Sequence, residues 1–212
     1  MRALLLAATL AATPALAQAP ADPAPPAAAP APAASPAAAP VPADLVRVTI
    51  STTRGPIVVA LDRGHAPVTV ANFLRYVDAK RLDGTAFYRA MKLWEGAGLV
   101  QFGTRGDPKR TYPGIAHEPT SKTGLSHTDG AISIAMNKPG TAAGDFFMIV
   151  GNVSTLDATA TDPGFAAFGH VVEGMDIVRG ILMSPTSPTQ GDGVMKGQML
   201  EPTIKVVSVR RG

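Results

Sequence analysis

The chain contains few residues suited to covalent chemistry, and their spacing matches none of the common catalytic motifs. It has no cysteine among its 212 residues, which excludes thiol catalysis, thiolate metal sites and disulfides. The sequence also lacks a glycine-rich phosphate loop, a dinucleotide-binding glycine pattern, a serine nucleophile elbow and a paired-histidine zinc motif. Nucleophilic and dinucleotide chemistry therefore lose support.

The four histidines, at positions 65, 117, 127 and 170, lack the spacing of a metal site. The one possible exception is His117, which stands beside Glu118. These two residues could form a metal site together with a carboxylate from a distant part of the chain. We expect ordinary histidines, in solvent or at the edge of the core, and no bound metal.

One arginine stands out by its neighbours. In the run Phe87-Tyr88-Arg89-Ala90-Met91, the two-residue period of a strand predicts that Arg89 shares a face with Phe87 and Met91. An arginine among apolar side chains needs a reason, because burying an unpaired charge is costly. Either the guanidinium has a functional role, or its stem packs while its head reaches water. The spacing leaves both interpretations open.

The elements that must position this arginine are mainly strands. Apolar residues at 70, 73, 74 and 77, following Pro67, predict one amphipathic helix, and a second short helix is expected over Met175 to Leu182. Strand patterns cover residues 46–51, 57–61, 86–91, 99–102, 131–136, 146–150, 166–171 and 203–209. About eight strands and two helices predict a mainly β fold, a closed eight-stranded antiparallel barrel capped by two helices.

The first 43 residues differ in composition from the rest. Residues 1–17 combine Arg2, an apolar run over 3–12 and the small-residue site Ala15-Leu16-Ala17, which together predict a cleaved secretory signal peptide. Residues 18–43 contain 13 alanines and 9 prolines among 26 residues, which predicts a semi-stiff, largely disordered linker. The expected globular domain is residues 44–212.

The export signal and the charge balance bound the partners. No cysteine follows the expected cleavage site, so a lipid anchor there is excluded. In a Gram-negative bacterium the product would be periplasmic, with no stable membrane insertion after cleavage. Residues 44–212 carry 18 basic and 15 acidic residues, a net charge of +3, and no run of Lys and Arg longer than two. We therefore do not expect nucleic-acid binding.

Several motifs, in family order, resemble those of the cyclophilins, which are peptidyl-prolyl cis-trans isomerases. The resemblance extends over nearly all of residues 45–210. The motifs read Ala-Pro-Val-Thr-Val-Ala-Asn-Phe at 66–73, Asp-Gly-Thr-Ala-Phe-Tyr-Arg at 83–89, Gln-Phe-Gly at 101–103, His-Thr-Asp-Gly-Ala-Ile-Ser-Ile-Ala at 127–135, Phe-Phe at 146–147 and Phe-Gly-His-Val-Val-Glu-Gly-Met-Asp at 168–176. The resemblance implies the same eight-stranded barrel, and rotation of X-Pro bonds without cofactor or metal.

The implied reaction suits a site without a nucleophile. Rotating an X-Pro bond breaks no covalent bond but crosses a barrier of roughly 18–20 kcal/mol. By resemblance, Arg89 matches the catalytic arginine of the family, whose guanidinium donates toward the prolyl nitrogen and favours its singly bonded form. That interaction strengthens as the bond twists, as catalysis requires.

The resemblance also implies a substrate-binding set. Phe147 matches the floor of the proline pocket, with Leu99 and Leu156 as apolar walls, although a place in the barrel core is the competing interpretation for all three. Gln101 matches the glutamine that hydrogen-bonds the substrate backbone. The predicted substrate-binding residues are Phe87, Leu99, Gln101, Ala135, Met136, Asp145, Phe147, Leu156 and Phe165.

Several positions depart from the family pattern. Asp145 replaces a glutamine, and a carboxylate there would either pair with Arg89 and compete with substrate, or orient the arginine. Phe165 stands where many relatives have histidine. Met136 stands where asparagine is frequent, next to Ala135, at the point where an exposed backbone pairs with the bound peptide.

The principal prediction is an exported, monomeric prolyl isomerase that acts on accessible X-Pro bonds of unfolded or partly folded chains. The alternative, motivated by Asp145 and Met136, is a binding module that keeps the proline-peptide pocket without rate enhancement and serves as a chaperone or scaffold. A hydrolase is not supported, because the sequence shows no motif that would position a nucleophile. If substitution of a serine such as Ser133 abolished activity, that interpretation would have to be reconsidered. Trp94 falls near the expected rim, where it either contacts substrate flanks or covers the barrel edge.

Overall fold

The computed structural model of the protein describes residues 44–94 and 96–212. The expected signal peptide (1–17) and linker (18–43) lie outside the described residues. Within them, no helix combines the length and the apolar composition that crossing a bilayer requires.

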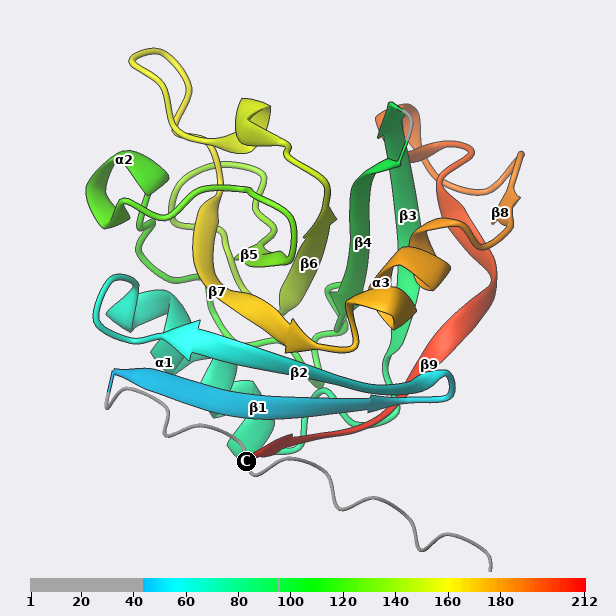
Figure 1. Ribbon diagram of the computed structural model, residues 1–212, viewed down its shortest axis with the longest axis horizontal. Helices are drawn as coiled ribbons and strands as arrows, with labels where there is room; N and C mark the ends of the chain where they lie inside the picture. Colours follow the sequence, from blue (N-terminus) through cyan, green and yellow to red (C-terminus); the bar gives the residue numbers. More distant parts are fainter. Residues whose placement is uncertain (1–43, 95) are drawn as a thin grey trace, which may run out of the picture. The chain divides into compact units, whose positions relative to one another are not determined.

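The strands of the described residues form one antiparallel sheet that closes on itself (Figure 1). They are β1 (Leu45–Thr52), β2 (Gly55–Asp62), β3 (Ala86–Trp94), β4 (Ala97–Gly103), β5 (Ala131–Ile134), β6 (Asp145–Val150), β7 (Ala166–Glu173), β8 (Thr186–Ser187) and β9 (Met199–Arg211). Eight strands follow the order β1-β2-β7-β5-β6-β4-β3-β9, and the pairing of β9 with β1 completes the ring. The predicted eight-stranded barrel is confirmed, with β8 as a two-residue addition beside β9.

Apolar side chains fill the barrel because alternate residues of each strand point inward. Phe87 and Phe102 meet with ring centroids 4.8 Å apart, and Phe146 meets Phe73 edge to face, also at 4.8 Å. We call this interior cluster the main core. Closing the ring leaves no long unpaired edge among its eight strands, which protects the sheet from pairing with other chains.

Two helices bury their apolar faces in the main core. Helix α1 (Pro67–Asp78) packs against β2, β7 and β9, and α3 (Met175–Leu182) packs against β2, β3, β4 and β6. Both were predicted from apolar spacing. The described residues add the four-residue helix α2 (Thr120–Thr123) and two 3-10 turns, η1 (Ser154–Leu156) and η2 (Gly193–Met195).

A distant carboxylate caps α1. The Glu118 carboxylate accepts hydrogen bonds from the backbone N–H of Val68 at 3.1 Å and of Thr69 at 2.7 Å. Both donors belong to the first turn, whose N–H groups lack partners within the helix, and the dipole favours a negative charge there. His117 instead donates its Nε2 proton to the carbonyl of Pro163 at 2.8 Å. The two residues thus serve the fold rather than one ligand set.

The register of β3 is interrupted after Phe87. Phe87 pairs with Phe102 but Arg89 pairs with Gln101, so β3 carries one extra residue, a β-bulge. Phe87 points into the barrel and is fully buried in the main core, whereas Arg89 bonds to Gln101 and Met91 on the outer face. The prediction that Phe87 and Arg89 share a face is wrong, because it assumed unbroken alternation. Arg89 does share a face with Met91.

Candidate active site

Three of the predicted site residues form one row across the outside of the barrel. Arg89 of β3 is the partner of Gln101 on β4, and Gln101 is the partner of Phe147 on β6. These strands lie side by side in Figure 1. Adjacent strands are about 4.8 Å apart, so Arg89 and Phe147 start from backbone positions roughly 10 Å apart. The row therefore places a charged side chain and an apolar one two strand spacings apart on the same face of the sheet.

A second apolar cluster, separate from the main core, covers this outer face. We call it the outer cluster. Its buried members are Leu99, Ala131, Phe147, Ile149 and Val153, and the partly buried Met91, Ala135, Leu156 and Phe165 pack against them. Five predicted substrate-binding residues therefore gather here, outside the barrel. The competing interpretation, that Leu99, Phe147 and Leu156 belong to the barrel core, is not what the structure shows.

Phe147 is the most enclosed of these five. Its residue is 2% exposed, and the partly exposed Met91, Leu156 and Phe165 pack against the cluster to which it belongs. The Phe165 ring meets it edge-on, with centroids 5.4 Å apart, and the His127 imidazole lies nearly parallel to it at 5.9 Å. Both contacts fix the plane of the Phe147 ring.

The Arg89 guanidinium is half-buried and bonded only to neutral groups. Nε donates to Gln198 Oε1 at 2.8 Å, Nη1 to Gln101 Oε1 at 3.0 Å, and Nη2 to Met91 Sδ at 3.4 Å. Burial lowers the pKa of Arg89 below its usual value, with Tyr88 opposing. Among residues 44–94 and 96–212, no carboxylate forms a salt bridge with it. The positive charge is therefore not neutralised at the site.

Asp145 does not pair with Arg89, so that hypothesis is wrong. Its Oδ1 accepts hydrogen bonds from the Tyr88 hydroxyl and from the Arg105 backbone N–H, both at 2.9 Å. Burial raises the pKa of Asp145, and burial next to this carboxylate also raises the pKa of Tyr88. The Arg105 guanidinium lies 5.0 Å from the centre of the Tyr88 ring. Asp145 is thereby held in a separate network, two residues before Phe147 on β6.

The structure separates the remaining predicted residues. Met136 packs against the main core, while its neighbour Ala135 packs against the outer cluster, since β5 ends just before them. The Ala135 N–H donates to the Asp145 carbonyl at 2.9 Å. Phe87, inside the barrel, lies on the opposite face of the sheet from Arg89. We therefore remove Phe87 from the substrate-binding set.

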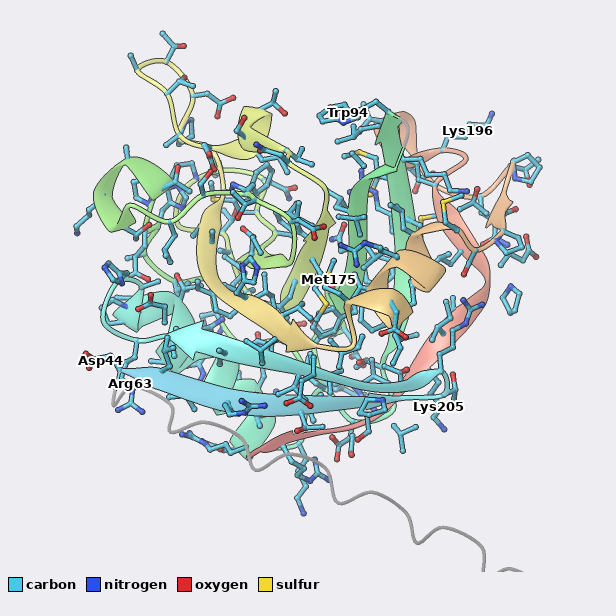
Figure 2. The ribbon with its side chains drawn as sticks, viewed as in Figure 1. Asp44, Arg63, Trp94, Met175, Lys196 and Lys205 are labelled. Carbon is cyan, nitrogen blue, oxygen red and sulfur yellow. The ribbon has the colours of Figure 1, made fainter. Side chains whose placement is uncertain are left out.

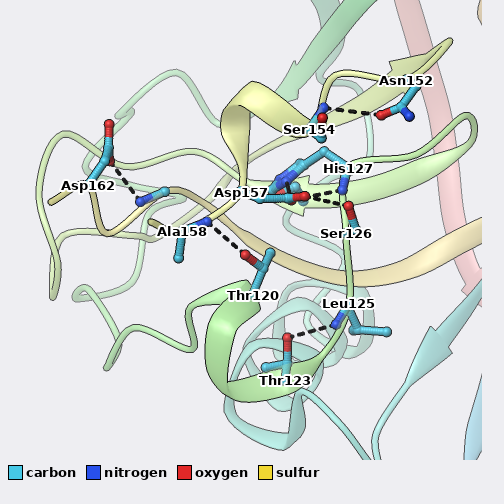
Figure 3. Close-up of polar contacts among 12 residues, drawn as sticks. Thr120, Thr123, Leu125, Ser126, His127, Asn152, Ser154, Asp157, Ala158 and Asp162 are labelled. Atoms are coloured by element: carbon cyan, nitrogen blue, oxygen red, sulfur yellow. Dashed lines mark hydrogen bonds and ion pairs between the residues drawn. The ribbon is translucent and has the colours of Figure 1, made fainter. Parts of the chain in front are cut away.

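A polar network lies next to Phe147, and Figure 3 shows the part of it in which Ser126 and His127 contact Asp157. His127 Nδ1 donates to Asp157 Oδ1 at 2.6 Å, and the Ser133 hydroxyl donates to His127 Nε2 at 3.0 Å. This tautomer follows because a carboxylate can only accept. Burial lowers the pKa of His127, whereas Asp157 raises it to a lesser extent. Hydrogen bonds from Ser126 and His127 outweigh burial and keep the pKa of Asp157 below its usual value.

Hydrolases use the same hydrogen-bonded arrangement of a serine, a histidine and an aspartate. No motif in the sequence predicted that these three residues would meet. Ser133 and His127 are both 0% exposed, beneath Phe147. A nucleophile must reach its substrate, and here the serine hydroxyl lies under the sheet's own side chains. The network therefore holds His127 against Phe147 rather than providing a nucleophile.

Sequence reasoning also missed Gln198 and Tyr88. Gln198 lies 109 residues after Arg89 along the chain, and only the pairing of β3 with β9 brings the two together. Tyr88 and Arg89 both lie on the outer face, because the bulge places two consecutive residues there. The motif that contains them locates the region, but strict alternation would put the two side chains on opposite faces.

Two further features lie apart from the row. Trp94 stands at the far end of β3 (Figure 2) and its residue is 53% exposed. A hollow along α1 is lined by Leu74, Arg75 and Tyr112, among others, and by none of the predicted site residues. Among the described residues, no three histidine or acidic side chains gather as a metal site would require.

Comparison with known proteins identifies the family. The model of the family "cyclophilin type peptidyl-prolyl cis-trans isomerase/CLD" matches residues 46–210. The chain belongs to this family. A protein from Acinetobacter baylyi named peptidyl-prolyl cis-trans isomerase is 34% identical over 166 residues, covering 77% of this chain and 84% of that protein. Peptidyl-prolyl cis-trans isomerase A of Dickeya dadantii is 35% identical over 133 residues, covering 61% and 67%.

The cyclophilin fold is also found among solved structures. A cyclophilin type isomerase of Cryptosporidium parvum, crystallised in the presence of the dipeptide Ala-Pro, matches with a TM-score of 0.64 and 20% identity. The match covers 78% of this chain and 98% of that one. At this identity the likeness concerns the fold alone.

Proposed function

We propose that this cyclophilin-family protein catalyses cis-trans rotation of X-Pro bonds, with Arg89 as its principal catalytic group. The observation that carries the proposal is the row Arg89, Gln101 and Phe147, in which an unneutralised guanidinium lies two strands away from the apolar outer cluster. The proline ring would bind above Phe147, and Gln101 would hydrogen-bond the substrate backbone. A remaining Arg89 N–H would donate to the prolyl nitrogen as it becomes pyramidal.

Two physical arguments support this assignment. An amide nitrogen gains a usable lone pair only when rotation breaks amide resonance, so a donor aimed at it stabilises the transition state more than the ground state. In addition, a donor in a partly dehydrated site interacts more strongly than one in water. Arg89 meets both conditions, because it is half-buried and its charge is not neutralised.

The test is isomerisation of short X-Pro peptides measured without a coupling protease. We expect Arg89→Ala to lower kcat/KM at least tenfold, or about 1.4 kcal/mol of transition-state stabilisation. Arg89→Lys should also lose activity, since lysine lacks the planar fork that engages Gln198 and Gln101 together. The control is Arg63→Ala, an exposed arginine in the turn after β2 (Figure 2). Full activity of Arg89→Ala would reject the role of this residue.

We further propose that the protein is a bacterial, exported, monomeric enzyme of the periplasm that acts on unfolded or partly folded exported chains. Support comes from the signal-like composition of residues 1–17 and the proline- and alanine-rich residues 18–43. The row of site residues lies within one chain, so catalysis needs no second subunit. N-terminal sequencing of the protein recovered from the periplasm should begin at Gln18. Retention of Met1 in a cytoplasmic fraction would contradict export.

The alternative, a binding module without catalysis, was argued from Asp145 and Met136, and the argument from Asp145 no longer holds. In one of the two interpretations of Asp145, its carboxylate competes with substrate for Arg89, yet this carboxylate is bound by Tyr88 and the Arg105 backbone instead. Peptide binding without acceleration by the wild-type protein would still favour that alternative.

A further inference from the structure

The Arg89 side chain uses only part of its hydrogen-bonding capacity inside the protein. A guanidinium carries five N–H donors. The contacts to Gln198, Gln101 and Met91 engage the single donor of Nε and one donor on each terminal nitrogen. These contacts leave one N–H on Nη1 and one on Nη2 for a substrate. Their direction depends on how the plane of the guanidinium is held.

Gln198 is itself held in a fixed orientation. Its Nε2 donates to the Val194 carbonyl at 2.7 Å, and because an amide nitrogen only donates, this bond turns Oε1 toward Arg89. The backbone is anchored as well. The Gln198 carbonyl accepts from the Ala90 N–H at 2.9 Å, and its N–H donates to the Met195 carbonyl at 3.1 Å. The amide is therefore built into the junction of η2, β9 and β3.

A neutral acceptor at Nε has a specific advantage over a carboxylate. Fixing Nε and Nη1 at once, through Gln198 and Gln101, fixes the plane of the planar guanidinium. A carboxylate at the same place would also neutralise the charge and could occupy two donors at once. The amide orients the group while leaving its charge for the substrate. Preorganised donors act without reorganisation at the moment of reaction.

We propose that Gln198 is a positioning residue that aims the free N–H groups of Arg89 at the prolyl nitrogen. The inference rests on the proposed function and goes beyond it, because it assigns a role in the reaction to a residue of the η2 and β9 junction. Gln198 acts through Arg89, so its effect must disappear when Arg89 is removed.

The experiment is a double-mutant cycle on the purified protein with a short X-Pro peptide. Gln198→Met keeps the length of the side chain but removes both the acceptor and the donor. We expect it to lower kcat about tenfold with KM changed less than twofold. In the Arg89→Ala background, the same substitution should change kcat less than twofold. The control is Gln190→Met, an exposed glutamine of the same loop, which should leave kcat unchanged.

Two results would overturn the inference. One is wild-type kcat in Gln198→Met. The other is a full tenfold loss of kcat when this substitution is added to Arg89→Ala, which would indicate a general structural effect.

Circular dichroism checks that each variant folds. If Gln198→Met does not fold, Gln198→Glu replaces it. Its charged form pairs with Arg89, whereas its protonated form can accept from Nε and donate to Val194 as glutamine does. Its kcat relative to wild type should therefore rise as pH falls from 8 to 5, and a flat ratio counts against the inference.

The readouts separate this inference from the proposed function. A wild-type protein without isomerase activity would reject the function. Gln198 would then be tested by the NMR signal of the Arg89 Nε–H proton. We expect slow exchange with solvent in the wild type and fast exchange in Gln198→Met. Equal exchange rates in both proteins would reject the positioning role.

Discussion

At the scale of single residues, the site keeps one positive charge free of any carboxylate. Arg89 bonds to two glutamines and a methionine, while Asp145, two residues before Phe147 on β6, accepts hydrogen bonds from Tyr88 and the Arg105 backbone. A guanidinium paired with a carboxylate would have fewer free N–H donors and less net positive charge, and would interact more weakly with a neutral amide nitrogen. The arrangement therefore favours donation to the substrate over internal ion pairing.

Asp145 gives a prediction about pH. Because burial raises its pKa in the folded protein, the folded state binds a proton more readily than the unfolded chain between the two pKa values. Its contribution to stability is present at low pH and is lost as pH rises through the folded pKa. We expect the unfolding free energy of Asp145→Asn minus that of wild type to be larger at pH 7 than at pH 4.

Urea unfolding at both pH values measures this difference. Asparagine retains an Oδ1 acceptor for the Tyr88 hydroxyl and the Arg105 N–H, so the fold should survive the substitution. The exposed Asp192→Asn is the control. An equal pH effect in both variants would show that Asp145 is not the group responsible.

At the scale of elements, backbones approach so closely that some positions tolerate no side chain. A Cβ on Gly169 of β7 would lie 2.5 Å from the Ala60 carbonyl oxygen and 2.9 Å from the Leu61 Cα of β2. By contrast, a Cβ on Gly180 of α3 would meet nothing within 4 Å. The same substitution at these two glycines should therefore have opposite effects.

We expect Gly169→Ala to destabilise the protein by about 1–3 kcal/mol, because backbone atoms of β2 must shift. Gly180→Ala should stabilise it by about 0.5–1 kcal/mol through helix propensity. Thermal unfolding of both variants against wild type is the measurement. A stable Gly169→Ala would show that β7 can move away from β2 at low cost.

Elements were predictable from the sequence where periodicity was local. The spacing of apolar residues gave α3 at its observed bounds, Met175–Leu182, and alternation located all eight barrel strands. What periodicity cannot report is a register change, so the bulge between Phe87 and Arg89 misplaced Phe87. Long-range partners were equally hidden. Glu118 caps a helix 50 residues earlier, and the roles of Gln198 and Asp157 depend on strand pairing and loop packing.

The substrate site was predictable in part for a different reason. Family motifs located Arg89, Gln101 and Phe147, and barrel geometry then brought them into one row. No local pattern, however, distinguishes a phenylalanine inside the barrel from one on its outer face. Neighbouring residues of one strand, Phe146 and Phe147, take these two places. Only the closed sheet decides which is which.

At the scale of the whole molecule, the last strand holds the barrel closed. β9 pairs with β3 through its first half and with β1 through its second, so it is the only described strand that joins the end of the domain to its start. Val206 and Val209 are fully buried in the main core. Arg210 pairs with Asp83 and Arg211 with Asp78 at the surface.

These contacts predict different results for two truncations. A chain that ends at Lys205 loses the two buried valines, at about 1.5–3 kcal/mol each, together with the ladder to β1. Since whole domains are stable by only about 5–15 kcal/mol, we expect no cooperative unfolding transition. A chain that ends at Arg210 loses one exposed ion pair, worth about 1 kcal/mol or less, and the terminal pairing of residues 211 and 212 with β1, but it keeps both buried valines and should remain folded.

Urea unfolding followed by circular dichroism distinguishes these outcomes. A cooperative transition in the chain that ends at Lys205 would show that the barrel holds without its closing pair. Activity adds a second test of the same point, because Arg89 pairs with Met199 in the half of β9 that this truncation keeps. If the row of Arg89, Gln101 and Phe147 needs only local pairing, the truncated chain would keep its catalysis. We expect that catalysis to be lost together with the cooperative fold, because closure of the ring holds β3, β4 and β6 in the register that aligns the row.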